Sequence, residues 1–158
     1  MKAIIDQVIA LLEDNELDCL VLEEDVAVKT GMAGHHGQWT CNIEVLRLTE
    51  SMYVLGAMSR STELVPPEAR ASVLVLMNLI NNYGVPVGNF QLDPSDGEVV
   101  FRTSAPFEAP EELSPELLAH TLYLNWAEID RFLPAVAAVM SGELPDDAFE
   151  SLAADADE

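Results

Sequence analysis

Basic residues are scarce in this 158-residue chain. It has 7 Lys and Arg residues against 28 Asp and Glu, so its formal net charge is −21 at pH 7. The bases form no run or stripe: they are Lys2, Lys29, Arg47, Arg60, Arg70, Arg102 and Arg131. Nucleic acids and anionic membrane surfaces attract proteins largely through clustered Lys and Arg. The composition therefore argues against direct binding to either, and it favours solubility or attraction to a basic partner protein.

Long apolar runs and paired cysteines are also lacking. No stretch approaches the roughly 18 apolar residues of a membrane span. Asp6 and Gln7 interrupt the apolar N-terminal segment, and no small-residue cleavage site follows, so residues 1–16 are predicted as an amphipathic helix and not a signal peptide. Cys19 and Cys41 belong to no CxxC or Cys/His cluster. We expect reduced, buried thiols of a cytoplasmic protein, with a disulfide between strands as the less favoured alternative.

Apolar residues are plentiful in spite of the charge. They make up 49% of the chain, and the mean hydropathy is +0.16. A disordered acidic chain would be poorer in them, because it could not offset its ordering entropy by burial. The length suits one domain, which we place at residues 1–142. Residues 143–158 carry seven acids and no base, and they are expected to form a mobile tail with at most one weak helical turn.

Hydrophobic periodicity predicts three helices and five strands. The helices cover residues 3–15, 66–84 and 115–140. The strands are 18–30 with a bend at 23–25, then 38–45 and 52–58, and the two arms of a hairpin at 88–102. A glycine-punctuated turn at 31–37 separates the first two strands. The order α-β-β-β-α-β-β-α predicts an α+β fold with an antiparallel sheet packed against helices on one side.

Particular residues mark the ends and breaks of the helices. Pro66 and Pro67 are predicted to open the second helix, and Gly84 is predicted to end it in the left-handed conformation. Ser114 is the expected cap of the third helix. Pro134 should kink or split that helix.

The second helix and the strand at 52–58 carry more apolar residues than one small core should need. The helix is apolar around most of its circumference, and the strand is apolar on both faces. Methionines in both suit an adaptable binding surface. The candidate dimer or partner surface consists of Met52, Val54, Met58, Val73, Leu74, Met77 and Ile80. The pattern leaves open whether this surface serves dimerisation or client binding.

The stretch from Val65 to Arg102 resembles the YbjN-like family. The matching positions are a helix with paired asparagines, a Gly-aromatic strand and a D-x-x-x-G-x-V hairpin: Asn78, Asn81, Gly88, Phe90, Asp93, Gly97, Val99 and Phe101. The closing helix is similar too, with Asp130 ahead of Phe132 and Pro134. The resemblance covers residue 1 to about 142. It implies a fold like that of type III secretion chaperones, which are acidic homodimers that bind an extended segment of a client.

Catalytic and metal-binding patterns are not evident. The sequence has neither a G-x-S-x-G elbow nor a glycine-rich phosphate loop. His35 and His36 are adjacent, so their side chains diverge, and His120 is distant in sequence. Asn78 and Asn81 are expected to bond to backbone at a helix–sheet junction, with Asn82 near the exposed helix end. We therefore predict no catalytic, cofactor or metal residue.

The function predicted from these features is a non-catalytic, homodimeric adaptor or chaperone-like module for a protein partner. The net charge favours a basic partner, such as a protein of DNA metabolism or a chaperone client. The alternative is a small cytosolic enzyme with an unrecognised pocket.

Overall fold

The computed structural model describes residues 2–23, 26–108 and 113–155. In this part of the chain the elements are α1 (Lys2–Asp14), β1 (Cys19–Glu23), β2 (Ala27–Ala33), β3 (Gln38–Arg47), β4 (Tyr53–Leu64), α2 (Arg70–Leu79), the π-helical turn η1 (Ile80–Gly84), β5 (Asn89–Leu92), β6 (Glu98–Phe107), α3 (Pro115–Met140) and α4 (Pro145–Asp155).

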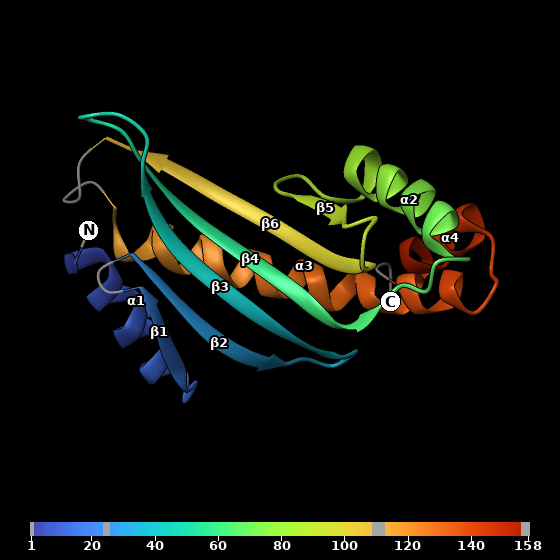
Figure 1. Cartoon of the computed structure of the whole chain (residues 1–158), viewed down its shortest axis with the longest axis horizontal. Coiled ribbons are helices and arrows are strands. Elements are labelled where there is room, and N and C mark those ends of the chain that lie inside the picture. Colours follow the sequence, from blue (N-terminus) through green and yellow to red (C-terminus); the bar gives the residue numbers. More distant parts are fainter. Residues whose placement is uncertain (1, 24–25, 109–112, 156–158) are drawn as a thin grey trace.

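The six strands of the described residues form one antiparallel sheet in the order β1-β2-β3-β4-β6-β5. Figure 1 shows α3 running along the back of this sheet, while α1 lies beside β1 and β2. Alternation in β3 explains the layering: Trp39, Cys41, Ile43 and Val45 are all buried against the helices. The α+β class predicted from the sequence is confirmed.

The first predicted strand is in fact two strands. β1 and β2 pair with each other as a hairpin, in a register that places Cys19 opposite Thr30. The predicted break at 23–25 falls between these two strands, and residues 24 and 25 lie outside the described residues. β2 also extends to Ala33, so the turn that follows is shorter than predicted and is closed by a bond from Gly34 N to Gly37 O. A charged interruption between two β-branched segments is expected where one strand bends and also where a turn joins two strands. The sequence pattern therefore does not separate the two cases.

The second helix is shorter than predicted at its start and ends differently. It begins at Arg70, because Pro66 starts a separate turn in which its carbonyl accepts a bond from Ala69 N. The helix ends in η1, and Gly84 is not among the glycines with positive φ. Gly84 is required for space instead: a Cβ there would lie 2.9 Å from the ring of Phe132. The predicted left-handed cap was therefore wrong.

The third helix is continuous through Pro134, so the predicted split does not occur. Its start agrees with the sequence, since the Ser114 hydroxyl accepts a hydrogen bond from Leu117 N at 3.2 Å.

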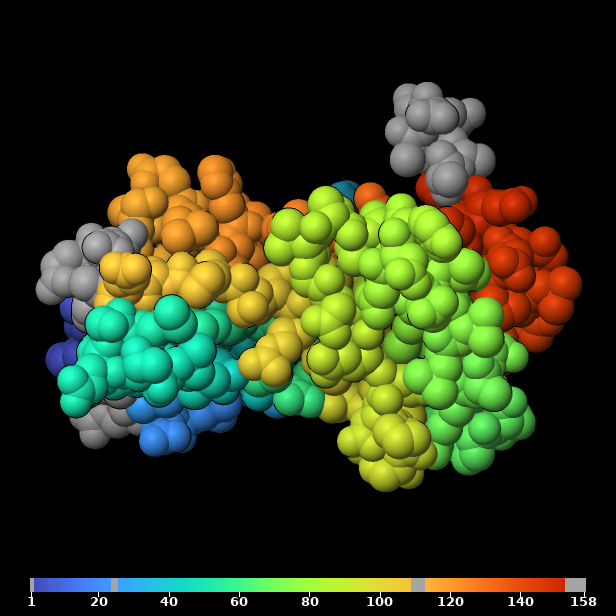
Figure 2. All heavy atoms as spheres, turned by 90° about the horizontal axis from the view of Figure 1, so that it is seen from above, coloured from blue at the N-terminus to red at the C-terminus, as the bar shows by residue number. Residues whose placement is uncertain are grey.

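The acidic C-terminal segment differs from the expected mobile tail. It contains α4, which packs against α2 and α3. Figure 2 shows α4 in red beside α2 in green. Ala148 is buried, and Phe149 and Leu152 pack on the core. Asp146 and Asp147 lie in the first turn, where they complement the positive end of the helix dipole. The signal for this helix in the sequence is the spacing of Leu144, Phe149 and Leu152 among the acids.

Candidate interaction surfaces

A buried polar network joins α3 to the middle of the sheet. Asn125 donates to the carbonyl oxygens of Ala57 and Phe101, both at 3.2 Å, and its Oδ1 accepts from the Ser59 hydroxyl at 2.6 Å. The Cys41 thiol lies 3.9 Å from the same oxygen. Burial raises the pKa of the Cys41 thiol, so the group stays protonated at neutral pH. These groups are enclosed by the core and position the helix on the sheet.

The two cysteines cannot form the alternative disulfide. Cys19 pairs with Thr30, and Thr30 pairs in turn with Cys41, so β2 lies between the two cysteines. Two strand spacings amount to about 10 Å, which exceeds the roughly 7 Å limit on Cα separation in a disulfide. Both thiols are free in the structure.

The face of the sheet that α1 and α3 do not cover holds part of the predicted surface. Val54 and Met58 point to this open face and are half-buried among their strand neighbours. Three bases lie on the same face, one each on β2, β4 and β6: Lys29, Arg60 and Arg102. Arg60 pairs with Glu98, and Arg102 lies 3.8 Å from Glu44. The open face is therefore mixed in polarity and not an apolar groove.

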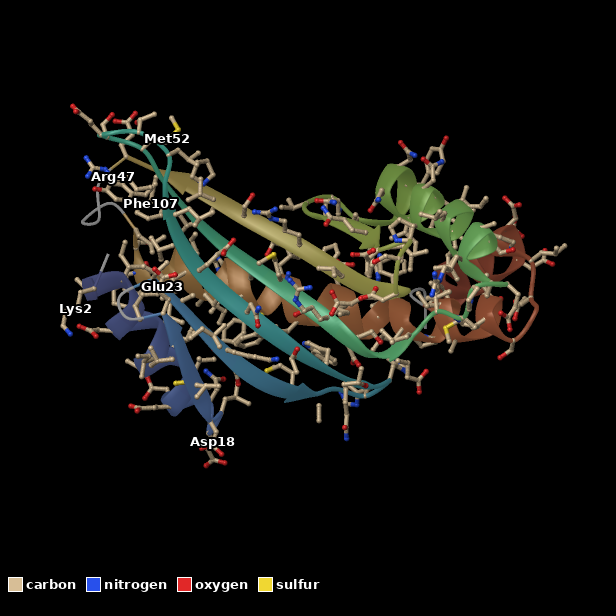
Figure 3. The ribbon with its side chains drawn as sticks, viewed as in Figure 1. Lys2, Asp18, Glu23, Arg47, Met52 and Phe107 are labelled. Carbon is tan, nitrogen blue, oxygen red and sulfur yellow. The ribbon has the colours of Figure 1, made fainter. Side chains whose placement is uncertain are left out.

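Met52 lies apart from the other predicted residues. It is exposed in the β3–β4 hairpin, where its carbonyl accepts a bond from Leu48 N at 2.8 Å. Figure 3 shows Met52 and Arg47 at the same end of the sheet, with Phe107 below them.

The second helix divides the remaining predicted residues between core and surface. Val73, Met77 and Ile80 are buried in the core and are not part of any surface of the chain. Leu74 is exposed on the opposite side of α2. Within the single chain, the seven predicted residues therefore do not form one continuous surface.

The asparagines of this helix have different roles. Asn81 bonds to the backbone of β5: its Nδ2 donates to Phe90 O at 3.0 Å, and its Oδ1 accepts from Phe90 N at 2.7 Å. The predicted junction contact is confirmed for Asn81. Asn78 instead receives both of its bonds from the exposed Asn82, which donates to its carbonyl at 2.7 Å and to its Oδ1 at 3.2 Å.

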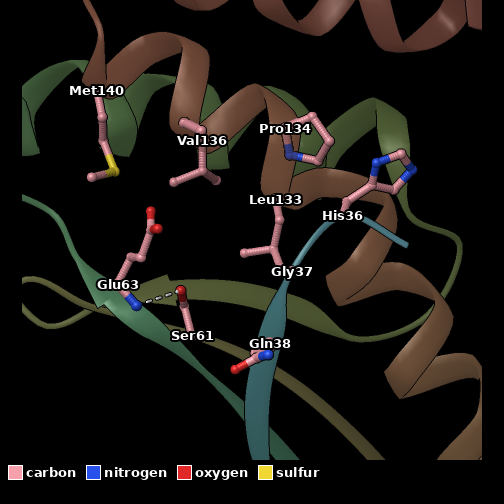
Figure 4. A pocket seen from close by; sticks show the side chains of 10 residues that line it. His36, Gly37, Gln38, Ser61, Glu63, Leu133, Pro134, Val136 and Met140 are labelled. Atoms are coloured by element: carbon pink, nitrogen blue, oxygen red, sulfur yellow. Dashed lines mark hydrogen bonds between the residues drawn. The ribbon is translucent and has the colours of Figure 1, made fainter. Parts of the chain in front are cut away.

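The histidine turn is held against α3. The backbone N–H groups of His35 and His36 both donate to the Asp130 carboxylate at 2.9 Å. A cavity of about 150 Å³ lies beside this turn, lined by His36, Gln38, Ser61 and Glu63 and by apolar residues of α3 (Figure 4). His120 is ten positions before Asp130 on the same helix, a distance of about 15 Å. Within the described residues, no three or more His, Cys, Asp or Glu side chains are grouped so that they could hold a metal ion.

Exposed apolar side chains occur on α2 and on the turn that follows it. Leu74 and Val75 are exposed on the helix, and Tyr83 follows in η1. The sequence from Ala71 to Leu92 contains no charged residue at all, in a chain whose net charge is −21. We call Leu74, Val75 and Tyr83 the α2 strip. The sequence analysis named Leu74 but missed Val75 and Tyr83, which could have been found as part of this uncharged stretch.

Taken together, the layers and the strand order define an α+β fold in which one long helix and a short N-terminal helix back an antiparallel sheet. Comparison with solved structures found a matching architecture. The chain has a YbjN-like fold: it is similar to the crystal structure of YbjN from E. coli, a proposed transcription regulator, with a TM-score of 0.53 and 14% sequence identity over 87% of this chain and 89% of that one. The resemblance seen in the sequence is thereby confirmed at the level of the fold.

Comparisons with protein-family models and with curated proteins found no match. Among the helices of the described residues, none has the length and apolar content needed to cross a membrane.

Proposed function

We propose that the chain is a non-catalytic protein-binding module that works as a homodimer, with the role of an adaptor or chaperone. The observation that carries this proposal is the α2 strip within an uncharged stretch of 22 residues, Ala71–Leu92. Exposed apolar patches of this kind mark sites of protein association.

Charge supports self-association through this surface in particular. Two copies with a net charge of −21 each repel one another over most of their surfaces. Contact through the α2 strip brings together residues of an uncharged stretch, so it adds no pair of like charges at the centre of the contact. A two-fold axis across α2 would place Leu74 and Val75 of one copy against the same residues of the other.

The acidic surface outside this stretch favours a basic protein partner, because complementary charge accelerates association and selects among partners. A protein of DNA metabolism and a chaperone client remain the two classes that we consider. The description of YbjN as a proposed transcription regulator is compatible with an adaptor that acts through another protein.

Sedimentation equilibrium of three proteins tests the dimer. We expect the wild type to dimerise at micromolar concentration and Leu74→Asp to weaken the dimer by about 30- to 100-fold, since it removes two buried leucines and adds two like charges. The matched control is Leu48→Asp in the β3–β4 hairpin: Leu48 is 58% exposed and Leu74 47%. Figure 1 places that hairpin and α2 at opposite ends of the molecule. A monomeric wild type, or equal weakening by Leu48→Asp, would contradict the proposal.

A further inference from the structure

The two edges of the sheet differ in whether their backbone groups are covered. In the described residues, β1 and β5 are the outermost strands. An edge strand presents unpaired backbone N–H and C=O groups, and these can pair with a strand from another chain unless something blocks them.

The β5 edge is closed by a side chain. The Asn81 amide accepts from Phe90 N and donates to Phe90 O, as the peptide group of a neighbouring strand would do. The helix that carries Asn81 also packs against this strand. No backbone pair is left at the centre of β5 for an incoming strand.

The β1 edge has no such cover among the described residues. Leu20, Val21 and Leu22 follow one another along it and are 63%, 48% and 48% exposed. The register shift between Val21 and Glu23 leaves Leu22 without an opposite residue in β2. Three consecutive exposed aliphatic residues on an open edge are the feature that natural sheets usually avoid, because it invites pairing.

Acidic residues surround this edge. Residues 13–25 include seven acids and no base. Glu16, Asp18 and Glu23 are exposed beside or at the ends of β1, and Figure 3 places Asp18 and Glu23 at its two ends. One base, Lys29, pairs with Leu20 across the hairpin.

We propose that β1 binds an extended basic segment of the partner protein, which adds to the sheet as a further strand. Backbone hydrogen bonds to β1 would fix the position and direction of the segment. The side chains of Leu20, Val21 and Leu22 would contact alternate apolar residues of the segment. Its Lys and Arg residues would face the flanking acids. This inference rests on the proposed function, and it adds the location of the binding site and the chemistry of the partner.

Charge also disfavours a second copy of this chain as the occupant. In an antiparallel pair of β1 strands centred on Val21, Cys19 of one copy would lie opposite Glu23 of the other. Asp18 and Glu23 would then approach across the pair with no base between them, which is destabilising. A basic segment removes this repulsion.

Fluorescence anisotropy with a labelled octapeptide that alternates valine and lysine tests the inference. We expect it to bind, and we expect Asp18→Lys/Glu23→Lys to weaken it by roughly tenfold at low salt. The control Glu143→Lys/Asp146→Lys makes the same charge change at exposed positions before and in the first turn of α4, and it should leave affinity within about twofold. A peptide with the same charge but N-methyl groups on alternate amides should lose binding, because those amides can no longer pair. Hydrogen exchange should show new protection at residues 19–23.

Each result decides the question. Binding that survives N-methylation, or that both charge variants weaken equally, would show attraction by charge alone and overturn the inference. Binding lost in Leu74→Asp but not in Asp18→Lys/Glu23→Lys would move the site to α2 and leave the proposed function intact. A dimer broken by Leu20→Lys and not by Leu74→Asp would make β1 the interface between copies, which overturns both proposals. Absence of binding by the lysine octapeptide overturns the inference, while the sedimentation result still decides on the dimer.

Discussion

Replacing Asn125 tests whether the buried network determines the stability of the sheet–helix interface. Asn125 is fully buried and, like leucine, branches at Cγ, so Asn125→Leu keeps the shape of the side chain while it removes three hydrogen bonds. The Ser59 hydroxyl and the carbonyls of Ala57 and Phe101 then lose these partners. At about 1–1.5 kcal/mol for each of these three buried groups, the variant should lose about 3–4.5 kcal/mol. Against a typical total of about 5–15 kcal/mol, this is a large share.

Urea denaturation followed by the fluorescence of the two buried tryptophans, Trp39 and Trp126, measures this loss. Wild type and variants are compared at one protein concentration, because a dimer makes the midpoint depend on concentration. Gln91→Leu is the control: Gln91 is exposed in β5 and outside the proposed α2 contact, and we expect a change within about 0.5 kcal/mol. Ser59→Ala alone should cost about 1–2 kcal/mol, and in the Asn125→Leu background it should cost almost nothing, since the hydroxyl has already lost its acceptor.

The reasoning is refuted by two results. One is a loss below about 1 kcal/mol for Asn125→Leu, which would mean that water or backbone rearrangement replaces the lost bonds. The other is strict additivity of the two substitutions, which would mean that the Ser59–Asn125 bond contributes nothing to stability.

Three further predictions follow from particular residues. In a thiol-labelling assay Cys19 should react in the native protein, while Cys41, whose pKa burial raises, should react only after unfolding. Glu128 is buried, and desolvation raises its pKa despite the nearby guanidinium of Arg131, so the folded state holds the proton more tightly than the unfolded state. Stability from this group therefore falls as pH rises through the ordinary glutamate range, and Glu128→Gln should match wild type near pH 4 and exceed it at pH 7 in thermal melts. Gly97→Ala should lower the free energy of unfolding by about 2–4 kcal/mol in urea titrations, because Gly97 has a φ of 90° and a Cβ there would lie 2.1 Å from the carbonyl oxygen of Val65; a near-neutral Gly97→Ala would contradict the geometry.

Patterns within single elements predicted much of the fold. Strict alternation located β3, and the turn residues before Gly97 located the β5–β6 hairpin. Asn81 was expected to bond to backbone at the junction, and it does. These features depend on residues close in sequence, where periodicity and turn chemistry act directly.

Features that depend on contacts between residues far apart in the sequence could not be predicted from local patterns. Whether residues 18–30 form one strand or two depends on what pairs with them. Which side of α2 is covered depends on α3 and α4. The central role of Asn125 was missed as well. A polar residue within the apolar stripe between Leu122 and Ile129 was the available signal, but its partners on β4 and β6 come from far along the chain.

Closure of one sheet edge by Asn81 limits how many neighbours a copy can have. Filament growth by edge pairing needs two reactive ends on each unit, as in the polymerisation of a difunctional monomer. With one edge capped, each copy has a valence of one for this type of contact, so strand pairing ends after a single addition. A protein of this kind can keep one unpaired edge strand available for a partner without assembling into fibres. The substitution Asn81→Ala would open the β5 edge, so each copy could pair at two edges. Such a variant would be able to assemble without limit.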